Sequence, residues 1–213
     1  MFALILTVAI PLSLLWLALR APAGQQTRAV DQGVGVLAGC LVGGRLGHVL
    51  VNWGYYQFHL DETAQVWLGG ISGVGAALGG ALALLLLAWL TRTRLSVLAD
   101  RMLPLLAVLS AAGWLGCWWE GCAYGLPADG AWWGLPARDE WGQARERFPL
   151  QLVGALLGLA IPWLVEAGLS SRYPRGAPPG WLGALSLLGL ALGWLGLSFL
   201  RGDPTLLWYS LRP

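Results

Sequence analysis

Six long stretches of apolar residues constrain this chain more than any other feature of its sequence. A helix needs about 20 predominantly apolar residues to cross the hydrocarbon core of a bilayer, and each stretch comes close to that length. The expected spans are residues 2–19, 33–52, 67–90, 97–119, 149–169 and 181–200. We therefore predict an all-α fold, a polytopic transmembrane helical bundle of six spans with a polar and aromatic outer-face region, built as a single membrane domain over residues 1–213.

The low charge content supports this prediction and excludes other classes. Charged residues make up 11% of the chain, whereas soluble domains carry about a quarter. The net charge of +2 is too small for a basic nucleic-acid-binding surface. Cys40 and Cys117 lie in apolar stretches and Cys122 lies just outside one, with no spacing typical of a metal site. We expect no nucleic acid partner, no metal, no cofactor and no disulfide framework.

The distribution of arginines predicts the orientation of the chain. The connections that follow the first, third and fifth spans carry seven arginines, counting Arg101, and the opposite side carries five. Because arginine favours cytoplasmic loops, the N-terminus and the connections 53–66 and 120–148 are expected outside the cytoplasm. Tryptophans lie in or beside these two connections, at Trp53, Trp67, Trp118, Trp119, Trp132, Trp133 and Trp141. They predict an outer interface layer that can include interfacial helices.

The second span has one face for packing and another that is polar. Small residues repeat every four positions at Gly35, Gly39, Gly43 and Gly47, so a neighbouring helix can approach closely on that face. At 100° per residue, Arg45, His48 and Asn52 gather in a narrow stripe on the other side. An arginine inside a span is expensive and usually faces a cavity or a partner. Arg45 either extends to the outer headgroups or forms an anion site for a lipid phosphate.

Other polar residues lie at the outer ends of later spans. Three roles are open for Glu120: a general base, a partner of Arg45, or a carboxylate that is simply solvated. Gln151 follows Pro149 in the first turn of the fifth span, so it either bridges two helices or meets a lipid headgroup. Arg201 lies at the outer boundary of the sixth span, where an arginine commonly anchors a helix.

Five short motifs follow one another from about residue 30 to residue 204. They are Gly44-Arg-Leu-Gly47, Trp67-Leu-Gly-Gly-Ile-Ser72, Gly113-Trp-Leu-Gly-Cys117 with Gly121-Cys-Ala-Tyr-Gly125, Phe148-Pro-Leu-Gln-Leu152, and Phe199-Leu-Arg201 before Asp203-Pro204. In order and spacing they resemble the prolipoprotein diacylglyceryl transferase family. The resemblance implies an enzyme of the bacterial cytoplasmic membrane, active at its outer side. Such enzymes move a diacylglyceryl group from phosphatidylglycerol to the cysteine of a lipoprotein precursor.

The resemblance also implies the site. His48 is the candidate base for the acceptor thiol, with Glu120 as an orienting group. The candidate phospholipid-binding residues are Arg45, Gln151, Arg201, Tyr124 and Gly125. Several positions depart from the family pattern; among them, Val74 stands where the family has its essential histidine and Trp114 where it has a key arginine.

Three functions therefore compete. The resemblance favours a diacylglyceryl transferase, whereas the departures favour a catalytically inactive lipid-binding or scaffold protein of the same fold. A small transporter could use Arg45, His48 and Asn52, but a pore needs polar stripes on several spans, and the first, third and sixth spans offer almost none. The family-level prediction is the transferase.

Overall fold

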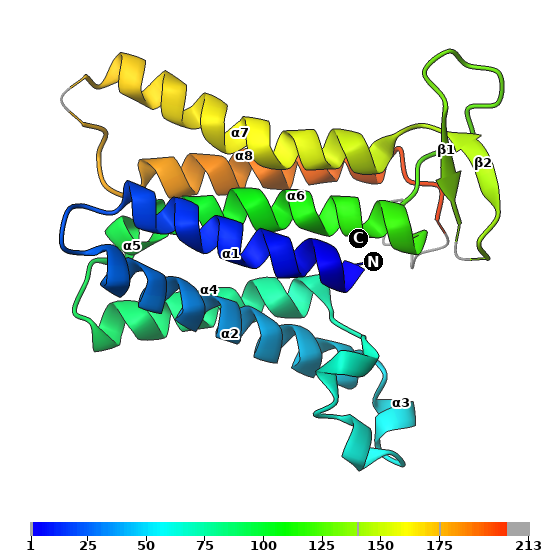
Figure 1. The fold of residues 1–213 in the computed structure, drawn as a ribbon, viewed down its shortest axis with the longest axis horizontal. Coiled ribbons are helices and arrows are strands. Elements are labelled where there is room, and N and C mark those ends of the chain that lie inside the picture. Colours follow the sequence, from blue (N-terminus) through cyan, green and yellow to red (C-terminus); the bar gives the residue numbers. More distant parts are fainter. Residues whose placement is uncertain (1, 140, 175, 204–213) are drawn as a thin grey trace. The chain divides into compact units, whose positions relative to one another are not determined.

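Helices dominate the computed structural model, which describes residues 2–139, 141–174 and 176–203. The long helices are α1 (Phe2–Arg20), α2 (Gln26–Val51), α4 (Gly73–Leu90), α6 (Leu103–Glu120), α7 (Leu150–Arg172) and α8 (Trp181–Ser198) (Figure 1). The short elements are α3 (Trp53–Tyr56), η1 (Leu60–Glu62), η2 (Val66–Leu68), α5 (Leu95–Arg101), β1 (Leu135–Arg138) and β2 (Ala144–Arg147). Within the described residues, six helices are long and apolar enough to cross a membrane. The predicted transmembrane helical bundle is confirmed.

Several span boundaries differ from the prediction, and the second span begins at Gln26 instead of residue 33. Two other differences have a local reason. The third span begins at Gly73 instead of residue 67, because Gly69 and Gly70 adopt positive φ angles of 88° and 77°. The Ser72 hydroxyl then caps α4 by accepting the N–H of Gly75 at 3.2 Å. The fourth span divides at Met102 into α5 and α6, and proline occupies the first turn of α6, where its missing N–H costs no helical hydrogen bond.

The chain forms two compact units, and we describe each by itself. Unit 1 comprises Met1–Trp16 with Met102–Pro213, and unit 2 comprises Leu17–Arg101. The single membrane domain expected from sequence stays a prediction.

In unit 2, α2 and α4 pack glycine against glycine, as expected from the four-residue spacing. A Cβ on Gly43 would lie 2.5 Å from the carbonyl oxygen of Gly75, and one on Gly39 would lie 2.7 Å from that of Gly79. The predicted packing face of the second span is therefore confirmed. At one end of this pair, Arg28 donates to the carbonyl oxygen of Thr91 at 3.3 Å. The connection 52–72 leaves α2 and enters α4 at the other end.

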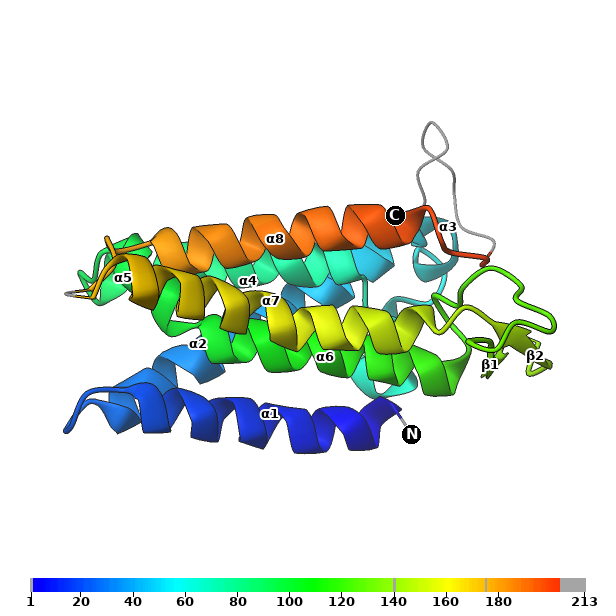
Figure 2. The ribbon, with the colours of Figure 1, turned by 90° about the horizontal axis from the view of Figure 1, so that it is seen from above.

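In unit 1, α7 packs against both α6 and α8 (Figure 2). Close approach of α6 and α7 depends on Gly158, where a Cβ would lie 2.8 Å from the Ser110 hydroxyl oxygen. The first part of α1 covers α6 through a cluster that includes Ala9, Val108 and Ala112. This three-helix core positions the ends of α6, α7 and α8, where the polar motifs lie.

The segment 121–148 contains a β-hairpin, and no helix is found in its described residues. Strands β1 and β2 pair antiparallel, with Leu135 opposite Arg147. The Asp139 carboxylate accepts the N–H groups of Trp141 and Gln143 at 3.1 and 2.8 Å, which fixes the turn between the strands. The other connection holds the short helix α3. Trp132 and Trp141 are 94% and 79% exposed, and the interface layer predicted for them stays a prediction.

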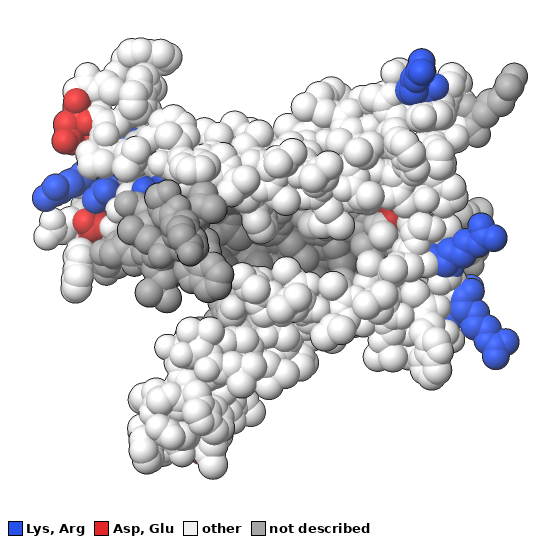
Figure 3. Space-filling view, turned by 180° about the vertical axis from the view of Figure 1, so that it is seen from behind, with Lys and Arg blue, Asp and Glu red and all other residues white. Residues whose placement is uncertain are grey.

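Charged side chains gather toward the helix ends on the face shown in Figure 3, and the helix flanks between them are almost entirely uncharged. Such a band of uncharged surface suits contact with acyl chains.

The expectation of no disulfide framework is wrong at one place, because Cys117 and Cys122 are joined. Helix α6 ends at Glu120, and Gly121 adopts a left-handed conformation with φ 73°. The turn brings the Cα atoms of the two cysteines to 4.7 Å.

Candidate functional site

Arg45 is enclosed by the connection that joins α2 to α4. Its Nε donates to the carbonyl oxygen of Thr63 at 2.8 Å. Its Nη1 donates to those of Gly69 and Gly70 at 2.5 and 3.2 Å, and its Nη2 donates to that of Glu62. The side chain is 5% exposed. Four backbone carbonyls therefore accept hydrogen bonds from a buried guanidinium. These hydrogen bonds hold the connection over the end of α2.

This arrangement changes what Arg45 can do. A guanidinium has five N–H donors, and most of them face carbonyl oxygens of the connection. The guanidinium carbon also lies 5.3 Å from the ring centroid of Tyr56, within cation–π range. An anionic headgroup would have to displace these partners to be held in bidentate fashion. The structure therefore gives Arg45 a loop-holding role, and its phosphate-binding role stays a prediction.

His48 lies one turn further along α2 and is half-buried. Its ring meets that of Tyr56 edge to face, with centroids 5.9 Å apart. The Asn52 amide nitrogen lies 3.5 Å from His48 Nδ1 and donates to the His48 carbonyl oxygen at 2.9 Å, so the predicted stripe of polar residues exists. A Cβ on Gly70 would lie 2.5 Å from His48 Nε2. Only glycine lets the connection approach the imidazole so closely.

Tyr55 and Glu62 also belong to this connection. The Tyr55 hydroxyl donates to the Glu62 carboxylate at 2.9 Å, and the ring stacks on His59 with centroids 4.2 Å apart. The hydrogen bond to Glu62 raises the pKa of the Tyr55 hydroxyl above its ordinary value. Tyr55 therefore acts as a hydrogen-bond donor here and is a poor candidate for a base.

In unit 1, the segment that follows α6 pairs with the segment that follows α8. Gly125 and Arg201 form an antiparallel bridge, and the N–H of Gly202 donates to the carbonyl oxygen of Tyr124 at 2.8 Å. Residues some 75 positions apart in sequence, from two of the motifs, are thus held together by backbone hydrogen bonds.

The same segment pairs on its other side with the chain that leads into α7. Pro127 forms a bridge with Arg147, and the N–H of Phe148 donates to the carbonyl oxygen of Leu126 at 2.9 Å. A Cβ on Gly125 would lie 2.9 Å from the Cβ of Phe148, so glycine is required for this close approach. Three of the five motifs therefore meet at one end of unit 1, and Tyr124 and Gly125 lie in the middle one of the three segments.

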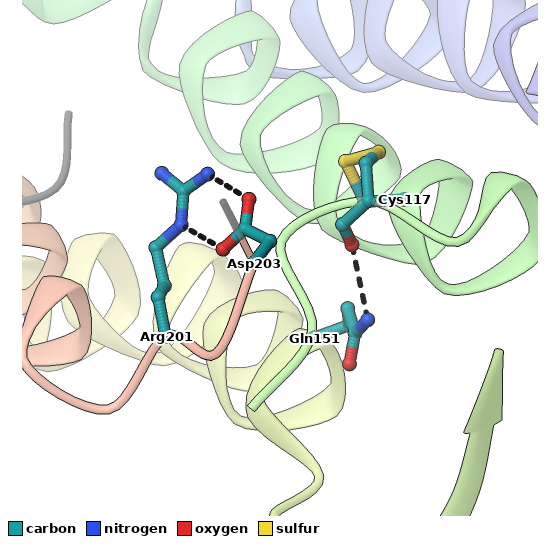
Figure 4. Close-up of polar contacts among 5 residues, drawn as sticks. Cys117, Gln151, Arg201 and Asp203 are labelled. Atoms are coloured by element: carbon teal, nitrogen blue, oxygen red, sulfur yellow. Dashed lines mark hydrogen bonds and ion pairs between the residues drawn. A yellow bond between two sulfur atoms is a disulfide. The ribbon is translucent and has the colours of Figure 1, made fainter. Parts of the chain in front are cut away.

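Gln151 ties α7 to this segment. It is fully buried, and its Nε2 donates to the carbonyl oxygen of Cys122 at 3.1 Å (Figure 4). Its Oε1 is buried and has no hydrogen-bond partner among the described residues. Gln151 thus bridges α7 and the segment that follows α6, which is one of the two roles expected. Its side-chain oxygen remains able to accept a hydrogen bond.

Arg201 is paired with Asp203. Its Nε donates to Asp203 Oδ1 at 2.9 Å and its Nη2 to Oδ2 at 2.5 Å, a bidentate pair of the kind that a guanidinium also forms with phosphate. Figure 4 shows the arginine side chain folded toward this carboxylate. Both side chains are mostly buried, at 16% and 10% exposed.

Sequence reasoning missed Arg147. Its guanidinium lies 4.1 Å from the ring centroid of Tyr124 and pairs with the Asp139 carboxylate at 3.4 Å. The side chains of both charged residues are less than a tenth exposed. Arg147 becomes a neighbour of Tyr124 only through the β-hairpin, which the sequence analysis did not predict.

The remaining candidates lie as follows. Glu120 is exposed at the last position of α6. Val74 is 68% exposed on α4. Trp114 packs its ring over Gly154 of α7, where a Cβ would lie 2.7 Å from the indole Cγ. Trp114 thus serves helix packing. Among the candidates, Tyr124, Gly125, Gln151 and Arg201 gather in unit 1, and Arg45 and His48 gather in unit 2.

Fold and site define a class: a multi-pass membrane protein whose glycine-rich polar motifs converge at helix ends. The model of the prolipoprotein diacylglyceryl transferase family matches residues 1–212, and the chain belongs to that family.

The curated relatives agree. The chain is 30% identical over 217 residues to the phosphatidylglycerol–prolipoprotein diacylglyceryl transferase of Thermosynechococcus vestitus, covering 97% of this chain and 78% of the relative. It is 33% identical over 204 residues to that of Nitrosomonas europaea, covering 84% and 71%. For that of Acaryochloris marina the identity is 32% over 181 residues, covering 83% and 65%.

Proposed function

We propose that this protein transfers the diacylglyceryl group of phosphatidylglycerol to a cysteine thiol of a lipoprotein precursor. The observation that carries the proposal is the family match over residues 1–212, whose relatives bear the name of this reaction. The convergence of three family motifs at one end of unit 1 supports it, because a catalytic site needs side chains held by rigid elements.

The reaction defines what the site must supply. The thiol sulfur forms a bond to the glyceryl carbon while the bond from that carbon to the phosphate oxygen breaks, so glycerol phosphate leaves and the thiol proton passes to a base. Positive groups stabilise the phosphate that departs. We assign that role to Arg201, whose paired N–H groups would exchange the Asp203 carboxylate for the phosphate, since both are bidentate acceptors. Tyr124, Gly125 and Gln151 of unit 1 would position the headgroup. His48, which belongs to unit 2, stays the base predicted from sequence alone.

A lipidation assay tests this function. Purified protein in vesicles that contain phosphatidylglycerol is incubated with a peptide that carries the precursor's cysteine motif, and the peptide mass is followed. The expected product carries one diacylglyceryl group per cysteine peptide, and a serine peptide stays unmodified. No product at high protein concentration contradicts the proposal.

One observation favours a second candidate, a lipid-binding protein without catalysis. Val74 and Trp114 replace the histidine and arginine that the resemblance places there, and Trp114 is packed against Gly154. This candidate predicts that phosphatidylglycerol copurifies with the protein although the peptide mass does not change.

We further propose that the protein resides in the bacterial cytoplasmic membrane, with the connections 53–66 and 120–148 outside the cytoplasm. The arginine distribution supports this orientation. The Cys117–Cys122 disulfide supports it independently, because disulfides persist on the oxidising side of that membrane.

A further inference from the structure

The end of α6 is closed by a covalent bond beside the motifs that converge in unit 1. Cys117 lies in the last turn of α6, and Cys122 is the second residue beyond that helix. We propose that the disulfide between them is a positioning device that holds the segment 122–125 in its working conformation. The inference rests on the proposed transferase function, since the segment is the middle one of the three that meet at that site.

The backbone of this segment needs such a constraint. Gly121 and Ala123 have φ angles of 73° and 49°, so left-handed residues lie on both sides of Cys122. Ala123 has a Cβ, which disfavours that region. Conformations of this kind persist where the surroundings fix them from several directions. The disulfide fixes Cys122 from the helix side, and the N–H of Cys122 also donates to the Cys117 carbonyl oxygen at 3.0 Å.

The backbone of this segment makes hydrogen bonds directly to the candidate site residues. The carbonyl oxygen of Cys122 accepts the Gln151 amide at 3.1 Å. Two residues further on, the carbonyl oxygen of Tyr124 accepts the N–H of Gly202 at 2.8 Å, and Gly125 bridges Arg201. A displacement of Cys122 would therefore alter the partner of Gln151 and the segment that pairs with Arg201.

The location of the bond favours a fixed constraint over redox catalysis. Reactive cysteines have stabilised thiolates, as at helix N-termini. Cys117 lies instead at the C-terminal end of α6, where the helix dipole disfavours a negative charge. Cys117 is thus a poor leaving group for thiol–disulfide exchange. Cys122 is exposed, so an added reductant can still reach the bond.

Reversible reduction tests the inference in a protein whose only other cysteine has been replaced, Cys40→Ser. Dithiothreitol converts the disulfide to two thiols and itself becomes a cyclic disulfide, and diamide restores the bond by taking up two electrons and two protons. Two quantities are measured in each state: amide hydrogen exchange, and the kcat and KM of lipidation with phosphatidylglycerol. The variant Cys117→Ser/Cys122→Ser is the control for direct effects of the reductant.

We expect reduction to speed exchange at least tenfold in residues 122–126 and 200–202 while α7 stays protected. The kcat should fall at least tenfold with KM within twofold, and reoxidation should restore both. The double serine variant should match the reduced state and ignore dithiothreitol. In that variant Ala123→Gly should recover part of the protection, because glycine accepts the left-handed conformation.

Two results would overturn the inference: exchange and kcat that ignore reduction, or an exchange increase that spreads over α6 and α7, which means general stabilisation instead of positioning. If the double variant does not fold, reduction of the Cys40→Ser protein decides. If the oxidised protein transfers no lipid at all, the proposed function fails, and the exchange data still decide whether the disulfide positions the segment.

Discussion

Arg45 illustrates how a buried charge is used in this protein. Its acceptors are the backbone carbonyls of residues 62, 63, 69 and 70, so the side chain adds hydrogen-bond donors to an irregular connection. Buried carbonyls left without donors would cost free energy. Arg45 is therefore a structural centre for the end of unit 2 that carries His48.

Replacing Arg45 separates this role from charge alone. Arg45→Lys keeps the charge but offers a point donor in place of a planar fork, and Arg45→Gln removes the charge. We expect both variants to lose stability, on the order of 3 kcal/mol, with faster hydrogen exchange in residues 62–70. Thermal unfolding in detergent and exchange mass spectrometry measure this. A lysine variant as protected as the parent would indicate that charge is what matters.

Arg147 and Asp139 form a buried charge pair, and the Arg147 guanidinium lies against the Tyr124 ring. Arg147→Met should destabilise the protein by about 3–5 kcal/mol, because it leaves a buried carboxylate without its partner. Asp139→Asn added to it should recover a large part of that loss, since the amide oxygen can still accept the N–H groups of Trp141 and Gln143. A double variant no more stable than Arg147→Met, in thermal unfolding, would refute the pairing.

At the scale of elements, packing of α2 on α4 depends on the absence of side chains. Gly39, Gly43 and Gly47 of α2 meet Gly75 and Gly79 of α4. Helices in lipid associate through such close backbone contact, because no hydrophobic force drives them together.

A methyl group tests this interface. A Cβ on Gly43 would meet backbone atoms of α4 at 2.5 and 2.6 Å, so Gly43→Ala should destabilise the protein by about 1–3 kcal/mol through overpacking. Gly73→Ala, on α4 but with open space at its Cβ, is the matched control and should be nearly neutral. Equal thermal unfolding of the two variants would argue against the glycine interface.

Some elements could be predicted from the sequence and others could not. The six spans and the glycine face follow from apolar length and a four-residue period, which are local signals. The cap at Gly121, the disulfide and the β-hairpin depend on where α6 ends, and a pattern of apolar residues defines such ends poorly. For the same reason Gln151 and Arg201 were identified as polar residues at helix ends, but their partners Cys122 and Asp203 were not.

At the scale of the whole molecule, each span carries the chain to the other side of the membrane, so successive connections lie on alternate sides. The proposed orientation places Ala64 outside the cytoplasm and Ser171, at the end of α7, inside. Both residues are exposed, so each can carry a reporter thiol in the Cys40→Ser protein.

Labelling of intact spheroplasts tests the orientation. Ala64→Cys should react with a membrane-impermeant maleimide at once, and Ser171→Cys should react only after the membrane is opened. The oxidised Cys117–Cys122 pair should remain unlabelled in both. The reverse pattern would place the convergent motifs on the cytoplasmic side and contradict the proposed localisation.

The chemistry itself is tested most directly by the mass of a cysteine peptide after incubation with the protein and phosphatidylglycerol. The peptide is predicted to gain one diacylglyceryl group through a thioether, and Arg201→Gln should slow that gain by about 10²-fold, as loss of a charge-stabilising donor does. A peptide mass that never changes, with lipid still bound to the folded protein, would leave a binding protein instead of a transferase.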